Sequence, residues 1–133
     1  MSLNYKYEQT KYGLYISFKG RICAHDLEFW FNKLFKEIED VKFKKSFGMI
    51  IKFDDIEPIC VEAARMLAAG RAFLIGKGLH RTAIVFDSSA KIVDLMRAFN
   101  IIGQYKLQRM ICTMANKDAD QKAIDWVENG IEP

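Results

Sequence analysis

The sequence predicts an α/β domain with a largely parallel sheet, and three observations support this. After an opening hairpin, helix-like and strand-like segments alternate to the end of the chain, which is typical of parallel strands joined by helical crossovers. Residues 47–53 and 81–87 are short, almost uniformly apolar runs, as expected for strands covered on both faces. The 133 residues are half hydrophobic with only two prolines, enough for one packed core.

The first two predicted elements are strands. Residues 5–9 and 13–18 are strand-like, and the short link between them suits a hairpin. In the second strand, Leu14, Ile16 and Phe18 alternate with more polar residues. We therefore expect one face of this strand to be buried.

Two predicted helices follow in the first half of the chain. Residues 26–40 place apolar side chains at spacings of three and four, and Asp26 lies in the first turn, where the helix dipole favours negative charge. The next helix begins near Cys60, extends to about residue 75 and is ended by Gly76. The apolar stripe of the first helix comprises Leu27, Trp30, Phe31, Leu34 and Ile38.

The second half completes a mostly parallel five-stranded sheet with four helices. A serine cap and a closing glycine predict a helix over residues 89–103, after the strand at 81–87. Residues 107–114 form the last predicted strand. Asp118 with Gln121 three residues later predicts a capping box at the start of the final helix.

The composition excludes several functional classes. The net charge is only +3, with basic and acidic residues mixed along the chain, so we expect no nucleic-acid partner. No apolar run is long enough for a membrane span, and the start lacks the apolar core of a signal peptide. The three cysteines are an odd number without a Cys-x-x-Cys spacing, which favours neither a disulfide framework nor a zinc site. We expect a cytoplasmic protein.

No pattern in the sequence indicates catalysis. His25 and His80 are isolated from carboxylates and cysteines at ligand spacing, so loop or capping roles are expected for them. Glycine-rich phosphate loops and the Gly-x-Ser-x-Gly motif of hydrolases are absent from the sequence. We therefore predict no catalytic residue, no metal site and no cofactor.

Four segments resemble the STAS domain, the sulphate-transporter and anti-sigma-factor-antagonist family with the SpoIIAA-like fold. Residues 13–22 are similar to its opening strand, and residues 51–67 to its central strand, loop and switch helix. Residues 80–103 are similar to its next strand and helix, and residues 118–127 to the final helix of small stand-alone members. The order and spacing of the segments carry the resemblance.

The resemblance implies a binding module rather than an enzyme. In the best-known branch of the family the partner is a serine kinase that is also an anti-sigma factor, and phosphorylation of the second serine in Asp-Ser-Ser-Gly releases it. Here that motif reads Cys60, Val61, Glu62 and Ala63. Because no hydroxyl is available to accept a phosphoryl group, we expect this switch to be absent.

Two residues at the switch position have alternative interpretations. Glu62 places a fixed negative charge in the first turn of a helix, as a permanent substitute for phosphoserine; the simpler interpretation is an acidic residue that stabilises a helix start. Cys60 stands where the family has aspartate. A thiol at a helix start can be reactive, but we favour a buried cysteine that acts as a small hydrophobic residue.

The helix after Cys60 has an outer side that we expect to dock a partner protein. Its side chains are mostly small, so a partner could approach the backbone closely; a plain alanine-rich helix surface is the alternative. The predicted outer side comprises Val61, Glu62, Arg65, Ala68, Ala69 and Ala72.

The first helix suggests two further interactions. Phe29 lies opposite its apolar stripe and is either a homodimer contact or a scattered surface residue. The alternative function is a carrier of a small apolar ligand or lipid. Trp30, Phe31, Leu34 and Met96 would then line a cavity of several hundred Å³.

Overall fold

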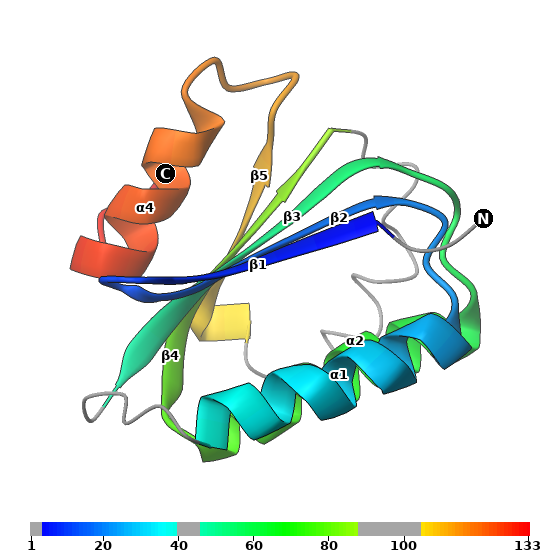
Figure 1. The fold of residues 1–133 in the computed structure, drawn as a ribbon. Coiled ribbons are helices and arrows are strands. Elements are labelled where there is room, and N and C mark those ends of the chain that lie inside the picture. The colour runs from blue at the N-terminus through cyan, green and yellow to red at the C-terminus, as the bar shows by residue number, and fades with distance from the viewer. Residues whose placement is uncertain (1–3, 40–45, 88–104) are drawn as a thin grey trace.

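The computed structural model describes residues 4–39, 46–87 and 105–133 and confirms the α/β class. A five-stranded mixed sheet packs with three α-helices in the described residues (Figure 1). The fourth predicted helix, at residues 89–103, lies outside the described residues. The described elements are β1 (Asn4–Thr10), β2 (Gly13–Gly20), α1 (Ala24–Glu39), β3 (Phe47–Ile56), α2 (Val61–Gly76), β4 (Leu79–Phe86), a 3-10 turn (Tyr105–Leu107), β5 (Gln108–Cys112) and α4 (Ala119–Asn129).

The strands lie in the sheet in the same order as in the sequence. β1 and β2 form the predicted antiparallel hairpin, and the pairs β2–β3, β3–β4 and β4–β5 are parallel. The register aligns one row of side chains across all five strands. That row is Tyr7, Ile16, Ile51, Ile84 and Met110, and side chains two residues away along each strand share its face.

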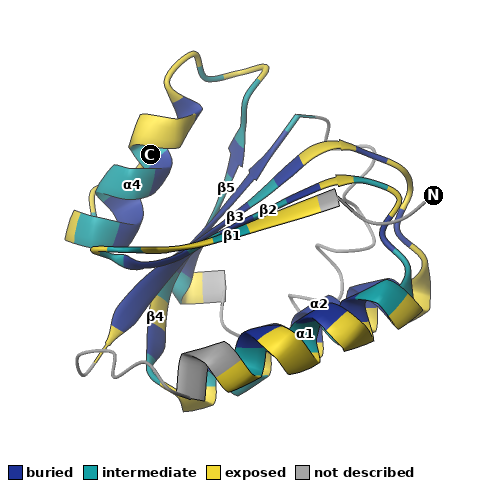
Figure 2. Ribbon diagram, viewed as in Figure 1, coloured by how far each residue is buried: buried dark blue, intermediate teal, exposed yellow. Residues whose placement is uncertain are grey.

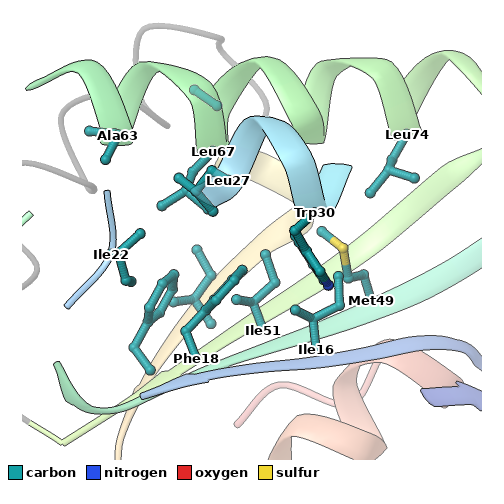
Figure 3. Close-up of a cluster of buried hydrophobic side chains, with 14 of the residues drawn as sticks. Ile16, Phe18, Ile22, Leu27, Trp30, Met49, Ile51, Ala63, Leu67 and Leu74 are labelled. Atoms are coloured by element: carbon teal, nitrogen blue, oxygen red, sulfur yellow. The ribbon is translucent and has the colours of Figure 1, made fainter. Parts of the chain in front are cut away.

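Helices α1 and α2 lie side by side over one face of the sheet (Figure 1). Leu27 and Trp30 of α1 and Leu67 of α2 pack onto the strands there, as Figure 3 shows. The helices also contact each other, since a Cβ at Gly70 would lie 2.9 Å from the Phe31 ring. The expected alternation in β2 is confirmed, because Leu14, Ile16 and Phe18 are all buried in this core.

Helix α4 covers the opposite face of the sheet (Figures 1 and 2). Its Ala123 and Trp126 form a second core with Ile50 of β3, Val85 of β4 and Ile111 of β5. The central strand β3 therefore contributes to both cores, as its uniformly apolar sequence predicts. Helix α4 packs mainly on β3, β4 and β5, so in the described part of the chain no helix covers most of the same face of β1 and β2.

The predicted capping box of α4 is wrong. Asp118 occupies the position before the helix, but its side chain makes no capping hydrogen bond there, and its backbone angles are φ −113° and ψ 39°. Gln121 instead donates a hydrogen bond of 2.9 Å to the Asp125 carboxylate. The end of the helix is as predicted, because Gly130 adopts the left-handed conformation that glycine tolerates (φ +70°).

Candidate functional site

The loop that leads into α2 is fixed to its neighbours at the carboxyl ends of the strands. Asp55 has a positive φ of 47°, and its backbone N–H donates a hydrogen bond of 2.9 Å to the Asp87 carboxylate, just after β4. The N–H of Glu57 donates to the carbonyl oxygen of Gly20 at the end of β2, at 3.0 Å. Strands β2, β3 and β4 thus jointly position the start of α2.

Cys60 is the N-cap of α2, and its predicted burial is wrong. The residue has extended backbone angles (φ −71°, ψ 161°), and its sulfur accepts a 3.4 Å hydrogen bond from the backbone N–H of Ala63. The side chain is exposed, because an N-cap residue lies outside the helix and directs its acceptor at the free N–H groups of the first turn. Sulfur is a weak acceptor, so Cys60 caps α2 more weakly than an aspartate would at this position.

Val61 and Glu62 both face solvent in the first turn of α2. Val61 is 58% exposed, which is high for an aliphatic residue, and Glu62 is also exposed. The Glu62 carboxylate lies near the positive end of the helix dipole, where a negative charge is stabilising. This position fits both interpretations of Glu62, as a helix-start residue and as a fixed negative charge that a partner reads.

The exposed strip of α2 is narrower than the sequence suggests. Ala68 was expected on the outer side but is only 5% exposed. It lies one turn from both Ala64 and Arg71, and these are buried too. Arg71 on this flank reaches Gln108 of β5. We define the α2 outer strip as the exposed residues Val61, Glu62, Arg65, Ala69 and Ala72.

Arg71 is a buried charged residue that the sequence analysis missed. It is 3% exposed, and its guanidinium donates a hydrogen bond to the side-chain carbonyl of Gln108, which is also buried. Burial lowers the pKa of Arg71. An arginine on the apolar flank of a helix was the available signal, since such a residue needs an internal partner. The pair links α2 to β5.

A groove of about 770 Å³ lies on the part of the sheet beside α4. Its lining is mostly polar, and Lys52 in it contacts Asp120 of α4 at 3.3 Å. Burial raises the pKa of the Tyr15 phenol, which lines the groove. The lining residues are Tyr5, Lys6, Glu8, Tyr15, Ser17, Phe18, Lys19, Lys52 and Asp54.

Three of the four residues expected to line an apolar carrier cavity lie in the described part of the chain. Trp30 and Leu34 are buried in the core between α1 and the sheet, while Phe31 packs on Trp30 with ring centres 5.1 Å apart. A pocket of about 200 Å³ beside Trp30 and Leu34 is also lined by Tyr5, Tyr7 and Lys33. Met96 lies outside the described residues.

The remaining candidates are surface residues. Phe29 is 72% exposed on α1, as predicted, and its role in dimerisation stays a prediction. His25 lies in the first turn of α1, and His80 lies within β4, so its expected loop position is wrong; both residues are exposed. Within residues 4–39, 46–87 and 105–133, no group of three His, Cys, Asp or Glu side chains could hold a metal ion.

Comparison with known proteins adds no family assignment. No model of a protein family matches the chain, and no curated protein matches it in sequence. In the described part of the chain, no helix is both long enough and apolar enough to cross a membrane. In the described residues, the two candidate sites are the α2 outer strip and the groove beside α4, which we call the sheet groove.

Proposed function

We propose that this chain is a non-enzymatic regulatory module of the STAS type, and that it docks a partner protein on the α2 outer strip. The observation that carries the proposal is the exposure of Val61 beside Glu62 and Arg65 at a helix start fixed by three strands. A partner can bury the apolar side chain of Val61, and the opposite charges of Glu62 and Arg65 can orient that partner.

The small residues of the strip add to its suitability for docking. Ala69 and Ala72 follow on the same exposed side of the helix, so a partner helix or loop could approach the α2 backbone without displacing long side chains. The loop before α2 is held by hydrogen bonds from Asp55 and Glu57. A surface that is already ordered loses little conformational entropy on binding.

The resemblance favours a serine kinase of the anti-sigma type as the partner. Glu62 carries a permanent charge where the family has its phosphorylated serine. The proposed module therefore stays in one state, and its binding is not controlled by phosphorylation at this position. Any regulation would act on the partner or on the amount of the module.

Site-specific cross-linking tests the docking surface. A photoreactive amino acid at Ala69 should give a discrete cross-linked protein in the native host cells, and the same group at exposed Gln121 on α4 should not. Once the partner is identified, Ala69→Arg should weaken its binding at least about tenfold, as expected when a bulky charge enters an interface. Equal cross-linking from both positions, or unchanged affinity of Ala69→Arg, would refute the docking surface.

Glu62→Gln separates the two interpretations of the acidic residue. If the partner reads the charge, this substitution weakens binding several-fold while stability changes by only a few tenths of a kcal/mol. If Glu62 only stabilises the helix start, binding stays the same. The substitution keeps the size of the side chain, so the comparison isolates the charge.

Small-ligand binding is the second candidate function, because the sheet groove has a volume in the range of ligand pockets, ~300–1,000 Å³. Its lysines, tyrosines and serine suit a polar ligand better than the apolar ligand or lipid expected from the sequence. Native mass spectrometry of the purified protein tests this candidate: a retained small molecule that is lost in Lys52→Ala supports it, and a mass equal to that of the bare chain opposes it.

A further inference from the structure

Strand β1 is an edge strand of the described sheet. It pairs with β2 over Asn4–Thr10 without a register shift, and it contains no proline or glycine. Among the described residues, no other strand pairs with its outer side. The outer side of an edge strand presents backbone N–H and C=O groups to which a further strand can be added, and proteins commonly protect such edges with proline, bulges or short length.

The sequence of β1 is complementary to itself around Tyr7. In an antiparallel pair centred on this residue, Lys6 of each copy lies opposite Glu8 of the other, and Tyr5 lies opposite Gln9. Lys6 and Glu8 are exposed and point to the same sheet face, because they align with Ser17 and Tyr15 of β2. The pairing therefore creates two opposite-charge pairs directly across the interface.

Other registers lack this complementarity. Pairing centred on Lys6 places the two lysines opposite each other, and pairing centred on Glu8 does the same with the two glutamates. A centre between two residues would align side chains that point to opposite faces, since directly opposed residues share a face. Only the Tyr7-centred register satisfies both the charges and the faces.

We propose that β1 pairs antiparallel with β1 of a second copy and joins the two five-stranded sheets into one. The two-fold axis is then perpendicular to the sheet, so both α4 helices lie on one face and both α1–α2 pairs on the other. Tyr5, which is 37% exposed at the edge of the core, is covered by the second copy. The two grooves become continuous, with Lys6 at their junction.

Charge reversal tests the interface and its register. The wild-type chain should sediment as a dimer. Lys6→Glu and Glu8→Lys each replace two attractive pairs with two repulsive ones and should raise the dimer dissociation constant on the order of tenfold or more. The double variant Lys6→Glu/Glu8→Lys restores opposite charges and should dimerise like the wild type. A mixture of the two single variants should form heterodimers.

Sedimentation velocity and circular dichroism give the readouts. The proposal is overturned if the wild-type chain is monomeric at concentrations of hundreds of micromolar. It is overturned in that case even where the β1 edge binds a strand of another protein. It is also overturned if folded Lys6→Glu dimerises normally while Phe29→Ser does not, because the interface would then lie on α1. Failure of the double variant to recover would exclude the Tyr7-centred register.

Discussion

The indole N–H of Trp126 donates a hydrogen bond of 3.1 Å to the backbone carbonyl oxygen of Thr82. This bond joins α4 to β4, and the Trp126 side chain is almost completely buried between them. The guanidinium of Arg109 lies 4.0 Å from the centre of the indole ring, a distance suited to a cation–π contact. One tryptophan therefore contributes burial, a hydrogen bond and a cation–π contact to the docking of α4.

Trp126→Ala should lower the free energy of unfolding by about 3–5 kcal/mol, because it leaves a large cavity in the second core. Trp126→Phe keeps most of the aromatic ring but lacks the N–H donor, so it should lower the free energy of unfolding by a smaller amount, about 1–2 kcal/mol. Urea denaturation followed by circular dichroism measures both. A change below about 1 kcal/mol for Trp126→Ala would show that α4 contributes little to the stability of the sheet.

The sequence predicts the elements of this fold better than their arrangement. Apolar runs identify β3 and β4, and the hairpin follows from alternation in β2, because these signals are local. Helix periodicity shows which side of α4 is apolar but not which face of the sheet it meets. That choice depends on the apolar residues on the second face, such as Ile50 and Ile111, which lie far apart in the sequence.

The same substitution should destabilise the chain at Ala68 and leave its stability nearly unchanged at Ala69. Ala68 is buried and Ala69 is exposed. Ala68→Arg forces a long charged side chain into a packed site and should cost at least about 2 kcal/mol of stability. Ala69→Arg should change it by less than about 0.5 kcal/mol, so its effect on partner binding can be measured on a folded protein.

Thermal and urea unfolding of the two variants provide the comparison. Equal destabilisation by both substitutions would show that the α2 outer strip is not a free surface. The two residues were indistinguishable in the sequence, because both are alanines in an alanine-rich stretch. In the structure, Ala68 lies one turn before buried Arg71, which bonds to Gln108 of β5, whereas Ala69 is exposed.

Cys60→Asp should stabilise the chain by about 1 kcal/mol. Aspartate is among the best N-cap residues and accepts from the N–H groups of the first turn more strongly than sulfur does. The exposed position leaves room for it, and the residue already has extended N-cap backbone angles. Cys60→Ala, which removes the acceptor, is the matched control and should be slightly less stable than the wild type.

Differential scanning calorimetry at neutral pH measures the midpoint temperatures of unfolding. The midpoint should be highest for Cys60→Asp, lower for the wild type and lowest for Cys60→Ala. A lower midpoint for Cys60→Asp would mean that the carboxylate does not reach Ala63 N–H, or that nearby Glu62 repels it. The capping role was missed in the sequence because cysteine is an uncommon N-cap, and its burial was inferred from residue type alone.

Glu132 should titrate below its ordinary value because of Arg109. The guanidinium of Arg109 donates hydrogen bonds to the Glu132 carboxylate, one of them at 2.7 Å, and these lower the pKa of Glu132 from the ordinary value of 4.5. A lowered carboxylate pKa in the folded state contributes stability above the unfolded value, and this contribution is lost as the pH falls through the folded pKa. The pair is exposed, so we expect a small effect that salt weakens.

Carboxyl-carbon NMR titration of Glu132 measures this shift directly. The midpoint should lie below 4.5 in the wild type and return toward that value in Arg109→Gln. The same substitution also removes the cation above the Trp126 ring, so Glu132→Gln is needed to isolate the ion pair. It should reduce stability at neutral pH, and the difference from the wild type should vanish at acid pH. A wild-type midpoint at or above the ordinary value would show that the pair does not persist in solution.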